Sequence, residues 1–376
     1  MRSSSTETCE GSTPPRFRTA ARSRLVIHSA ARGETTINPA SAHADIAAIQ
    51  TSDSDASFDA RARRPGTIVS TPITATRIQS AGSTGPPYFQ RMTSGRGRAS
   101  FGASGTTTGY DRLDGLNLRD GTLVTTANQF SDESAPFDTE SLTMKIRTST
   151  MSFFGAYGVT DRLEIGGVVP LVQLNIDGSR VNVYRGTSIV QATGSASASG
   201  LADMALRAKY LLVSSRNAGF AAAGEVRLPT GDEAALLGAG RAALKIMAIG
   251  SVENPRVGAH GNFAIVRGGA SDEIDGSGAV TVAATPRLTI AGELLVRRLT
   301  DVRQMVAVSA AHPTIDGVET LRLVPGTSIP TLTSAVTGIK WNVHATLVLT
   351  GEVRWRIGNA GLTAPFTPTI AIDYLF

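Results

Sequence analysis

The sequence has no apolar run long enough to form a membrane helix. A transmembrane helix needs about 20 consecutive, predominantly apolar residues. No run in the 376-residue chain approaches this length, and charged residues make up 18% of the chain. A helical membrane protein is therefore excluded. The other backbone that can cross lipid is a closed β-barrel, whose alternating strands are neutral in average hydropathy.

Cysteine and lysine are also scarce. The single cysteine, Cys9, cannot form an internal disulfide. Because there are only four lysines, the net charge of +5 comes mainly from arginines dispersed along the chain. Nucleic acid binding needs basic residues gathered on one face or one helix. The charge therefore does not indicate a nucleic acid partner.

The first 40 residues lack the apolar core of an export signal, since only Leu25, Val26 and Ile27 form an apolar run. This absence favours one alternative, a secreted soluble β-sandwich that stays in solution without detergent. Residues 1–90 are rich in Ser, Thr, Ala, Arg and Pro and show no structural period. Such a segment buries too little apolar surface to offset its ordering entropy. We predict that residues 1–90 are disordered, or a mis-started stretch outside the mature protein, and that residues 91–376 form the barrel.

From about residue 96 the pattern of apolar and polar residues changes. Apolar and polar residues alternate in blocks of about ten, the length of a tilted membrane strand. Twelve strands are predicted: 97–110, 142–157, 162–176, 202–213, 218–228, 241–250, 256–266, 275–284, 287–299, 332–341, 345–357 and 367–376. The fold class is therefore all-β, a closed antiparallel transmembrane barrel of about 12 strands.

The connections between these strands are alternately long and short. The short ones are 158–161, 214–217, 251–255, 285–286 and 342–344, and the long ones are 111–141, 177–201, 229–240, 267–274, 300–331 and 358–366. Bacterial outer-membrane barrels have short periplasmic turns and longer extracellular loops. A soluble sandwich has no reason to alternate in this way, so the pattern predicts the bacterial outer membrane.

Each strand should carry one apolar and one polar face, because side chains alternate across a strand. In strand 345–357 the apolar face holds Leu347, Leu349, Val353, Trp355 and Ile357. A charge on the lipid face near mid-bilayer costs about 2–4 kcal/mol, so one face must be free of charge. Strands 202–213, 218–228, 287–299 and 367–376 divide in the same way. In strand 162–176 the alternation shifts near Pro170, which predicts a β-bulge there.

The polar faces predict a charge ladder along the lumen. A Gly-Glu pair recurs at 224–225, 292–293 and 351–352, each time with an inward arginine further along the same strand. The predicted ladder is Glu225, Arg227, Glu293, Arg297, Glu352, Arg354, Arg356, Arg207 and Lys209. It could filter solutes, as rings of charges do in pores. The simpler interpretation, which we favour, is that buried charges pair with one another.

Counting the charges predicted to face inward gives an expectation for selectivity. The inward cations are Lys145, Arg147, Arg207, Arg227, Lys245, Arg297, Lys340, Arg354 and Arg356. The inward acids are fewer, namely Glu164, Asp203, Glu225, Glu293, Glu352 and Asp373. A conducting lumen is therefore expected to prefer anions mildly.

Aromatic residues near the short turns predict one girdle at the membrane interface. Its members are Tyr157, Tyr210, Phe220, Trp341, Tyr374 and Phe376. The terminal Tyr-Leu-Phe resembles the signal that the barrel-assembly machinery reads on outer-membrane proteins. The resemblance gives Phe376 the role of assembly signal and makes that machinery, with outer-membrane lipid, an expected partner.

No catalytic residues are predicted, and the chain is not expected to be an enzyme. The barrel histidines His260, His312 and His344 have no nucleophile and acid at matching positions. Metal-ligand spacing is absent, so no metal and no cofactor are expected. Residues 272–275 include three acids that could bind calcium, but a solvated loop is the more common outcome.

Several segments together resemble one known family. They are YDRLDGLNLRDG (110–121), GVTDRLEIGG (158–167), GLADMALRAKYLL (200–212), LPTGD (228–232), TPRLTIAG (285–292) and ETLRLVPG (319–326). Their order is similar to that in outer-membrane β-barrel transporter-like proteins associated with the meta-pathway of phenol degradation. This resemblance implies a porin-like barrel that acts as a passive channel for small solutes, including hydrophobic or aromatic ones. The alternative is a non-conducting surface barrel that binds ligands through its long loops.

Overall fold

The structure, a computed structural model, describes residues 93–344 and 346–376, and the described chain is built from β-strands. The prediction for residues 1–90, Cys9 included, lies outside the described residues. Within the described part, no helix is long and apolar enough to cross a membrane.

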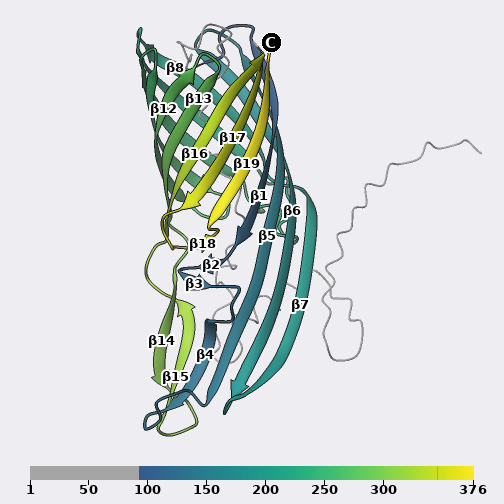
Figure 1. Cartoon of the computed structure of the whole chain (residues 1–376), viewed down its shortest axis with the longest axis vertical. Coiled ribbons are helices and arrows are strands. Elements are labelled where there is room, and N and C mark those ends of the chain that lie inside the picture. Colours follow the sequence, from purple (N-terminus) through teal and green to yellow (C-terminus); the bar gives the residue numbers. More distant parts are fainter. Residues whose placement is uncertain (1–92, 345) are drawn as a thin grey trace, which may run out of the picture.

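Twelve strands form one closed antiparallel ring (Figure 1). Around the ring the order is β5, β1, β19, β17, β16, β13, β12, β11, β10, β9, β8 and β6, and pairing between β5 and β6 completes the closure. Their bounds are β1 (Ala99–Tyr110), β5 (Asp138–Gly158), β6 (Leu163–Tyr184), β8 (Met204–Ser214), β9 (Ala218–Leu228), β10 (Ala243–Glu253), β11 (Val257–Gly268), β12 (Glu273–Thr285), β13 (Leu288–Leu299), β16 (Thr331–His344), β17 (Leu347–Arg356) and β19 (Phe366–Leu375). The predicted fold class is confirmed, and each predicted strand overlaps one ring strand.

The first and last ring strands are neighbours, so the two ends of the barrel chain meet. Ser100 pairs with Leu375, and the backbone N–H of Phe376 donates to the carbonyl of Ala99 at 2.9 Å. Both ends lie on the side of the short turns, as an even number of strands requires. We call this side the short-turn end and the opposite side the long-loop end.

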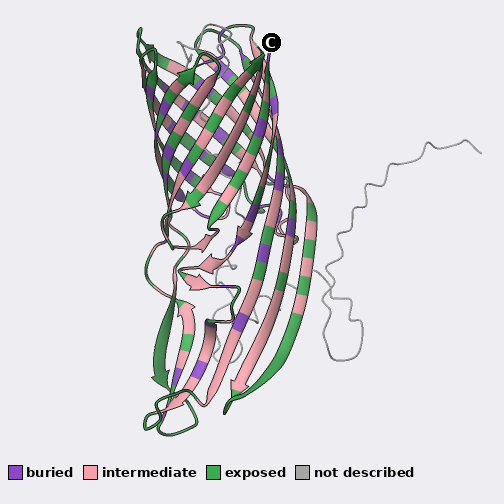
Figure 2. Cartoon of the chain, in the orientation of Figure 1, coloured by how far each residue is buried: buried purple, intermediate pink, exposed green. Residues whose placement is uncertain are grey.

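The outer surface of the ring is apolar and open to its surroundings. Leu206, Ile246, Val280, Ile339 and Ile370 are between 52% and 66% exposed, and many other Leu, Ile and Val residues resemble them. Figure 2 shows exposed residues alternating with buried and half-buried ones along the ring strands. A soluble monomer rarely exposes so large a continuous apolar surface. The β-sandwich alternative is therefore wrong, and the apolar faces point outward.

Pro170 does not cause the predicted bulge. The pairing of β6 with β5 runs without a shift from Phe153–Val169 through Ser152–Pro170. On its other side, β6 pairs with β8 as far as Val168 and with another strand from Leu171 onward. A proline lacks the N–H that a ladder needs. Here the missing donor falls where β6 exchanges one partner for the next, and the Pro170 carbonyl still accepts from the Ala202 N–H at 2.9 Å.

The long-loop end carries a second structure that the sequence did not predict. β5 and β6 continue beyond the ring, where β7 (Thr187–Leu201) pairs with β6 and β4 (Leu123–Phe130) pairs with β5. Beyond β4 lie β15 (Val318–Pro325) and β14 (Met305–Ala311), which completes the order β14-β15-β4-β5-β6-β7. We call this sheet the outer sheet; it fills the lower half of Figure 1. Three predicted loops, 111–141, 177–201 and 300–331, thus contain strands.

An apolar cluster lies where β1, β5 and β6 meet the outer sheet. Its buried members are Tyr110, Leu118, Leu123, Leu142, Ile146, Leu174 and Leu237. A small sheet of β2 (Arg112–Leu113), β3 (Leu116–Asn117) and β18 (Leu362–Thr363) packs beside it. The outer sheet is therefore fixed to the barrel by packing as well as by the two shared strands.

Candidate functional site: the barrel lumen

The lumen contains charged side chains that are almost fully buried. Glu225 on β9 is 4% exposed and lies between two arginines. The Nε atom of Arg207 donates to its carboxylate at 3.0 Å, and the Nε atom of Arg227 donates at 3.2 Å. Because a single buried carboxylate would be costly, these contacts explain why Glu225 is tolerated.

A second pair lies nearer the short-turn end. The Nζ atom of Lys209 is 2.9 Å from the carboxylate of Glu164, and both residues are buried. Ser94, which precedes β1, donates to the same carboxylate from its backbone N–H at 2.7 Å and from its hydroxyl at 2.6 Å. Ser94 is 3% exposed, so the residues before β1 contribute to the filling of the lumen at this end.

A third group near the long-loop end joins β12 and β13 to β10, across the intervening β11. The Nζ atom of Lys245 donates to Asp275 at 2.7 Å. Arg297 forms ion pairs with Glu273 at 3.3 Å and with Asp275 at 3.4 Å. Asp275 and Glu273 belong to β12 and face the lumen, whereas the sequence suggested a solvated loop for them.

The remaining ladder residues lie on β13 and β17. Glu293 on β13 is 7% exposed. It pairs with Val336 on β16, and Val336 pairs on its other side with Arg354 on β17. Glu352 lies two residues before Arg354 on the same inward face. Arg356 donates to Asp111 at 2.6 Å, a partner that the sequence did not suggest. The structure thus brings together the charges of neighbouring strands in local groups, and their role as a filter stays a prediction.

Two cations that were predicted to face the lumen point outward instead. Lys145 and Arg147 are exposed and have the same parity along β5 as the outward Met151 and Tyr157. They lie close to the end of the pairing between β1 and β5, which stops at Tyr110–Ile146. The prediction was wrong because β5 continues past the membrane-facing part of the ring, where cations on the outer face are tolerated.

This correction changes the charge balance of the lumen. The inward cations are Arg207, Lys209, Arg227, Lys245, Arg297, Lys340, Arg354 and Arg356. The inward acids are at least as numerous: Glu164, Asp203, Glu225, Glu253, Glu273, Asp275, Glu293, Glu352 and Asp373. The cation excess that favoured anion preference is therefore absent.

All six aromatics predicted for the girdle are exposed on the outer face near the short-turn end. Their exposures range from 43% for Tyr374 to 70% for Phe376, and these two rings lie 4.7 Å apart. A second aromatic group, which was not predicted, lies at the long-loop end, where Trp355 and Phe366 are exposed with ring centroids 6.3 Å apart. Their outward parity was a usable signal. The girdle role stays a prediction.

The described residues offer little else that could support chemistry. Among them, no group of three or more His, Cys, Asp or Glu residues could hold a metal ion. His260 contacts the Thr281 hydroxyl at 3.3 Å and lies 3.8 Å from Glu253, whereas His312 accepts bonds within its own turn.

Comparison with known families identifies the central part of the chain. A family described as "Putative MetA-pathway of phenol degradation" matches residues 125–305, just under half of the chain. Four of the six segments that carry the resemblance lie inside this range, and the segments at 110–121 and 319–326 lie outside it. No match is found among curated protein sequences.

Several solved structures are similar in fold. A COG4313 outer membrane channel from Pseudomonas putida F1 has a TM-score of 0.46 and 12% identity, over 75% of this chain and 96% of that one. The P. putida toluene transporter TodX has a TM-score of 0.35 and 10% identity, over 79% and 95%. The NanC porin has a TM-score of 0.36 and 6% identity, over 72% and 98%. Because all these scores are below 0.5, the function of this chain rests on its own residues.

Proposed function

We propose that this protein is a passive channel for small solutes, hydrophobic and aromatic ones included, in the bacterial outer membrane. The observation that carries the proposal is a closed twelve-stranded ring with an apolar exterior and a charged, internally paired interior. A barrel with this division of faces belongs in lipid and encloses a polar path.

The width of the ring supports a narrow path rather than an open pore. Barrels of about 8 strands are filled by side chains, and those with about 16–18 strands hold a water-filled channel. A ring of twelve lies between these cases. Glu225, Lys209 and Glu293 are each less than 8% exposed, which is consistent with a lumen largely filled by its own side chains. Only small solutes would pass through such a lumen.

The orientation follows from the connections. The short turns would face the periplasm, and the outer sheet would stand outside the cell. The C-terminal strand, with Phe376 exposed at its end, would present the signal that the assembly machinery binds. The proposal assigns no chemical reaction to the chain.

A second candidate function is favoured by the outer sheet. A channel needs no such projection, whereas a surface barrel that binds ligands outside the cell would present one. In this case the paired charges only fill the lumen, and the protein conducts nothing.

Conductance separates the two candidates. Folded protein, checked by the shift in gel mobility on heating, is inserted into planar lipid bilayers and single-channel currents are recorded. In parallel, vesicles containing the protein are loaded with benzoate, whose charge slows its passage through lipid, and its efflux is followed. We expect discrete small conductance steps and faster efflux than from protein-free vesicles. Folded protein that gives neither result would refute the channel and favour the surface barrel.

A further inference from the structure

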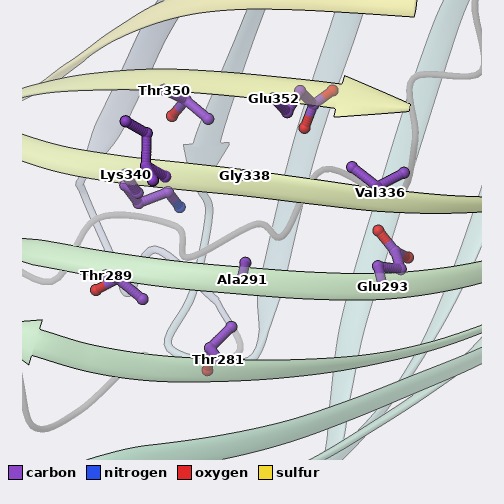
Figure 3. A pocket seen from close by; sticks show the side chains of 10 residues that line it. Thr281, Thr289, Ala291, Glu293, Val336, Gly338, Lys340, Thr350 and Glu352 are labelled. Carbon is purple, nitrogen blue, oxygen red and sulfur yellow. The ribbon is translucent and has the colours of Figure 1, made fainter. Parts of the chain in front are cut away.

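The lumen wall contains a recess on β12, β13, β16 and β17 (Figure 3). Three cross-strand rows define it. Thr289, Lys340 and Thr350 form the row nearest the short turns. Ala291, Gly338 and Glu352 form the middle row, to which Thr281 is joined by its pairing with Ala291. Glu293 and Val336 lie in the third row.

The recess exists because its middle row is small. Gly338 has no side chain, and a Cβ added there would lie 3.2 Å from the Cβ of Glu352 and 3.2 Å from the Gly351 carbonyl oxygen. Ala291 beside it contributes only a methyl group. The cavity has a volume of about 30 Å³. A cavity needs roughly 10–15 Å³ on this scale to hold one water molecule, so the recess fits a hydroxyl group but not an aromatic ring.

The recess is polar at both ends. Figure 3 shows Lys340, Thr289 and Thr350 toward one end, with Glu352 and Glu293 toward the other. A hydroxyl group both donates and accepts hydrogen bonds, so it can use an ammonium or threonine hydroxyl on one side and a carboxylate on the other.

Thr350 provides an independent indication of a ligand. Its hydroxyl oxygen is buried and has no hydrogen-bond partner among the described residues. Buried polar groups in proteins are nearly always hydrogen-bonded, and each exception calls for an explanation. A hydroxyl group held in the recess would supply the partner.

The charges of the lining restrict the class of ligand. Two carboxylates, Glu293 and Glu352, are balanced by Lys340 and by Arg354, which pairs with Val336 of the third row and interacts with both carboxylates. Because the recess carries no unbalanced positive charge, it offers no net attraction to an anion such as a carboxylate, whereas a neutral hydroxyl needs none. The size of the recess requires that the apolar body of the ligand stays outside it, in the lumen.

We propose that this recess binds the hydroxyl group of a small neutral alcohol or phenol on its way through the barrel. The inference rests on the proposed channel function and deepens it, because it identifies one point in the lumen where a solute is held. Thr350 and Gly338 are the determinants of the site, since one offers the unused hydroxyl and the other provides the space.

Binding is tested by ¹⁹F NMR on the full-length barrel in detergent micelles with three probes: 4-fluorophenol, fluorobenzene, which lacks the hydroxyl, and 4-fluorobenzoate. The variants are Thr350→Val, which removes the hydroxyl at constant shape, and Gly338→Ala, which fills the recess. Thr150→Val is the matched control, because Thr150 is a buried, inward threonine on β5, away from the recess. Heating-dependent gel mobility confirms that each variant is folded.

We expect protein-dependent binding of 4-fluorophenol that weakens by roughly three- to tenfold in Thr350→Val, the range that one buried hydrogen bond supports. Gly338→Ala should weaken it at least as much, and Thr150→Val should not change it. Fluorobenzene binding as tightly as 4-fluorophenol, tighter binding of 4-fluorobenzoate, or an unchanged affinity in Thr350→Val would each overturn the inference. The measurement requires no ion flow. Conductance without this binding therefore rejects the recess alone, and binding without conductance rejects the channel alone.

Discussion

The apolar exterior makes a quantitative prediction about charge and depth. Leu294 is 48% exposed at the middle of β13, where it pairs with Gly278 and Ala335. Leu212 is 46% exposed near the short-turn end of β8. The two leucines have the same side chain and nearly the same exposure, so Leu294→Arg and Leu212→Arg differ in depth and in one local feature, since Leu212 lies at a register shift in the pairing of β8 with β9.

In lipid the two substitutions should have different costs. An arginine at the bilayer midplane of a barrel costs about 2–4 kcal/mol, and near the interface it costs about 0–1 kcal/mol. The Leu294→Arg variant should therefore lose about 2–3 kcal/mol more unfolding free energy than Leu212→Arg. This difference corresponds to roughly a 30- to 150-fold change in the ratio of folded to unfolded protein.

The assay is equilibrium unfolding by urea of barrels refolded into lipid vesicles. Trp341 and Trp355 are 48% and 45% exposed on the outer surface, so their fluorescence reports transfer from lipid to water. On the surface of a soluble protein both substitutions would stay within about 0.5 kcal/mol of the parent. Equal stabilities of the two variants within that margin would therefore refute the lipid-facing assignment.

Three further predictions concern the lumen and the terminus. Glu225→Ala, which leaves Arg207 and Arg227 without their shared carboxylate, should lower the unfolding free energy by about 3–5 kcal/mol, and Glu225→Gln by less, in the same urea assay. A stability unchanged by Glu225→Ala would show that the group is not sealed from water. Because the inward cations do not outnumber the inward acids, the reversal potential in a salt gradient should show no anion preference, and a clear anion preference would contradict the count. Deletion of Phe376 should reduce the amount assembled in the outer membrane while refolding in detergent is unaffected, as measured by cell fractionation; normal assembly would remove its role as a signal.

The barrel could be predicted from the sequence because two independent patterns agreed. Alternation of side chains placed apolar residues such as Leu349 and Ile370 on one face, and alternation of connection lengths set the strand number. Both patterns are imposed by the membrane, which tolerates neither a charge outside nor an unpaired edge. Contacts with the rest of the fold can therefore do little to override the strands and faces that the sequence predicts in this part of the chain.

The outer sheet could not be predicted because no membrane constrains it. β7 is Thr187–Leu201, and its Ser, Ala, Gly and Thr residues have the composition of a flexible connection. It becomes a strand because β6 extends beyond the ring and offers a free edge for pairing. The same extension explains why Lys145 and Arg147 were wrongly predicted to face the lumen. They lie on the outward face of β5, near the point where the strand leaves the ring and an outward side chain no longer has to contact lipid. For Pro170, the sequence showed that a backbone N–H donor is missing. It did not show that β6 changes its pairing partner from β8 to β7 at this point, so that the missing donor disrupts no ladder.

The recess in the lumen wall was also out of reach from sequence. Thr289, Gly338 and Thr350 come from three strands, and only the register of pairing places them beside one another. Strand parity predicts that each faces inward, but it does not predict which residues share a row.

The continuity of β5 and β6 has a consequence for how this molecule can be divided. The two strands pair with each other along their whole length, from Gly158–Glu164 to Asp138–Tyr184. No hinge or linker separates the membrane part from the projection, so the projection is not a module that can be cut away at a boundary. Removing the projection would shorten β5 and β6, which are strands of the barrel itself. A force applied to the tip of the projection would be transmitted along the backbone of these two strands into the barrel.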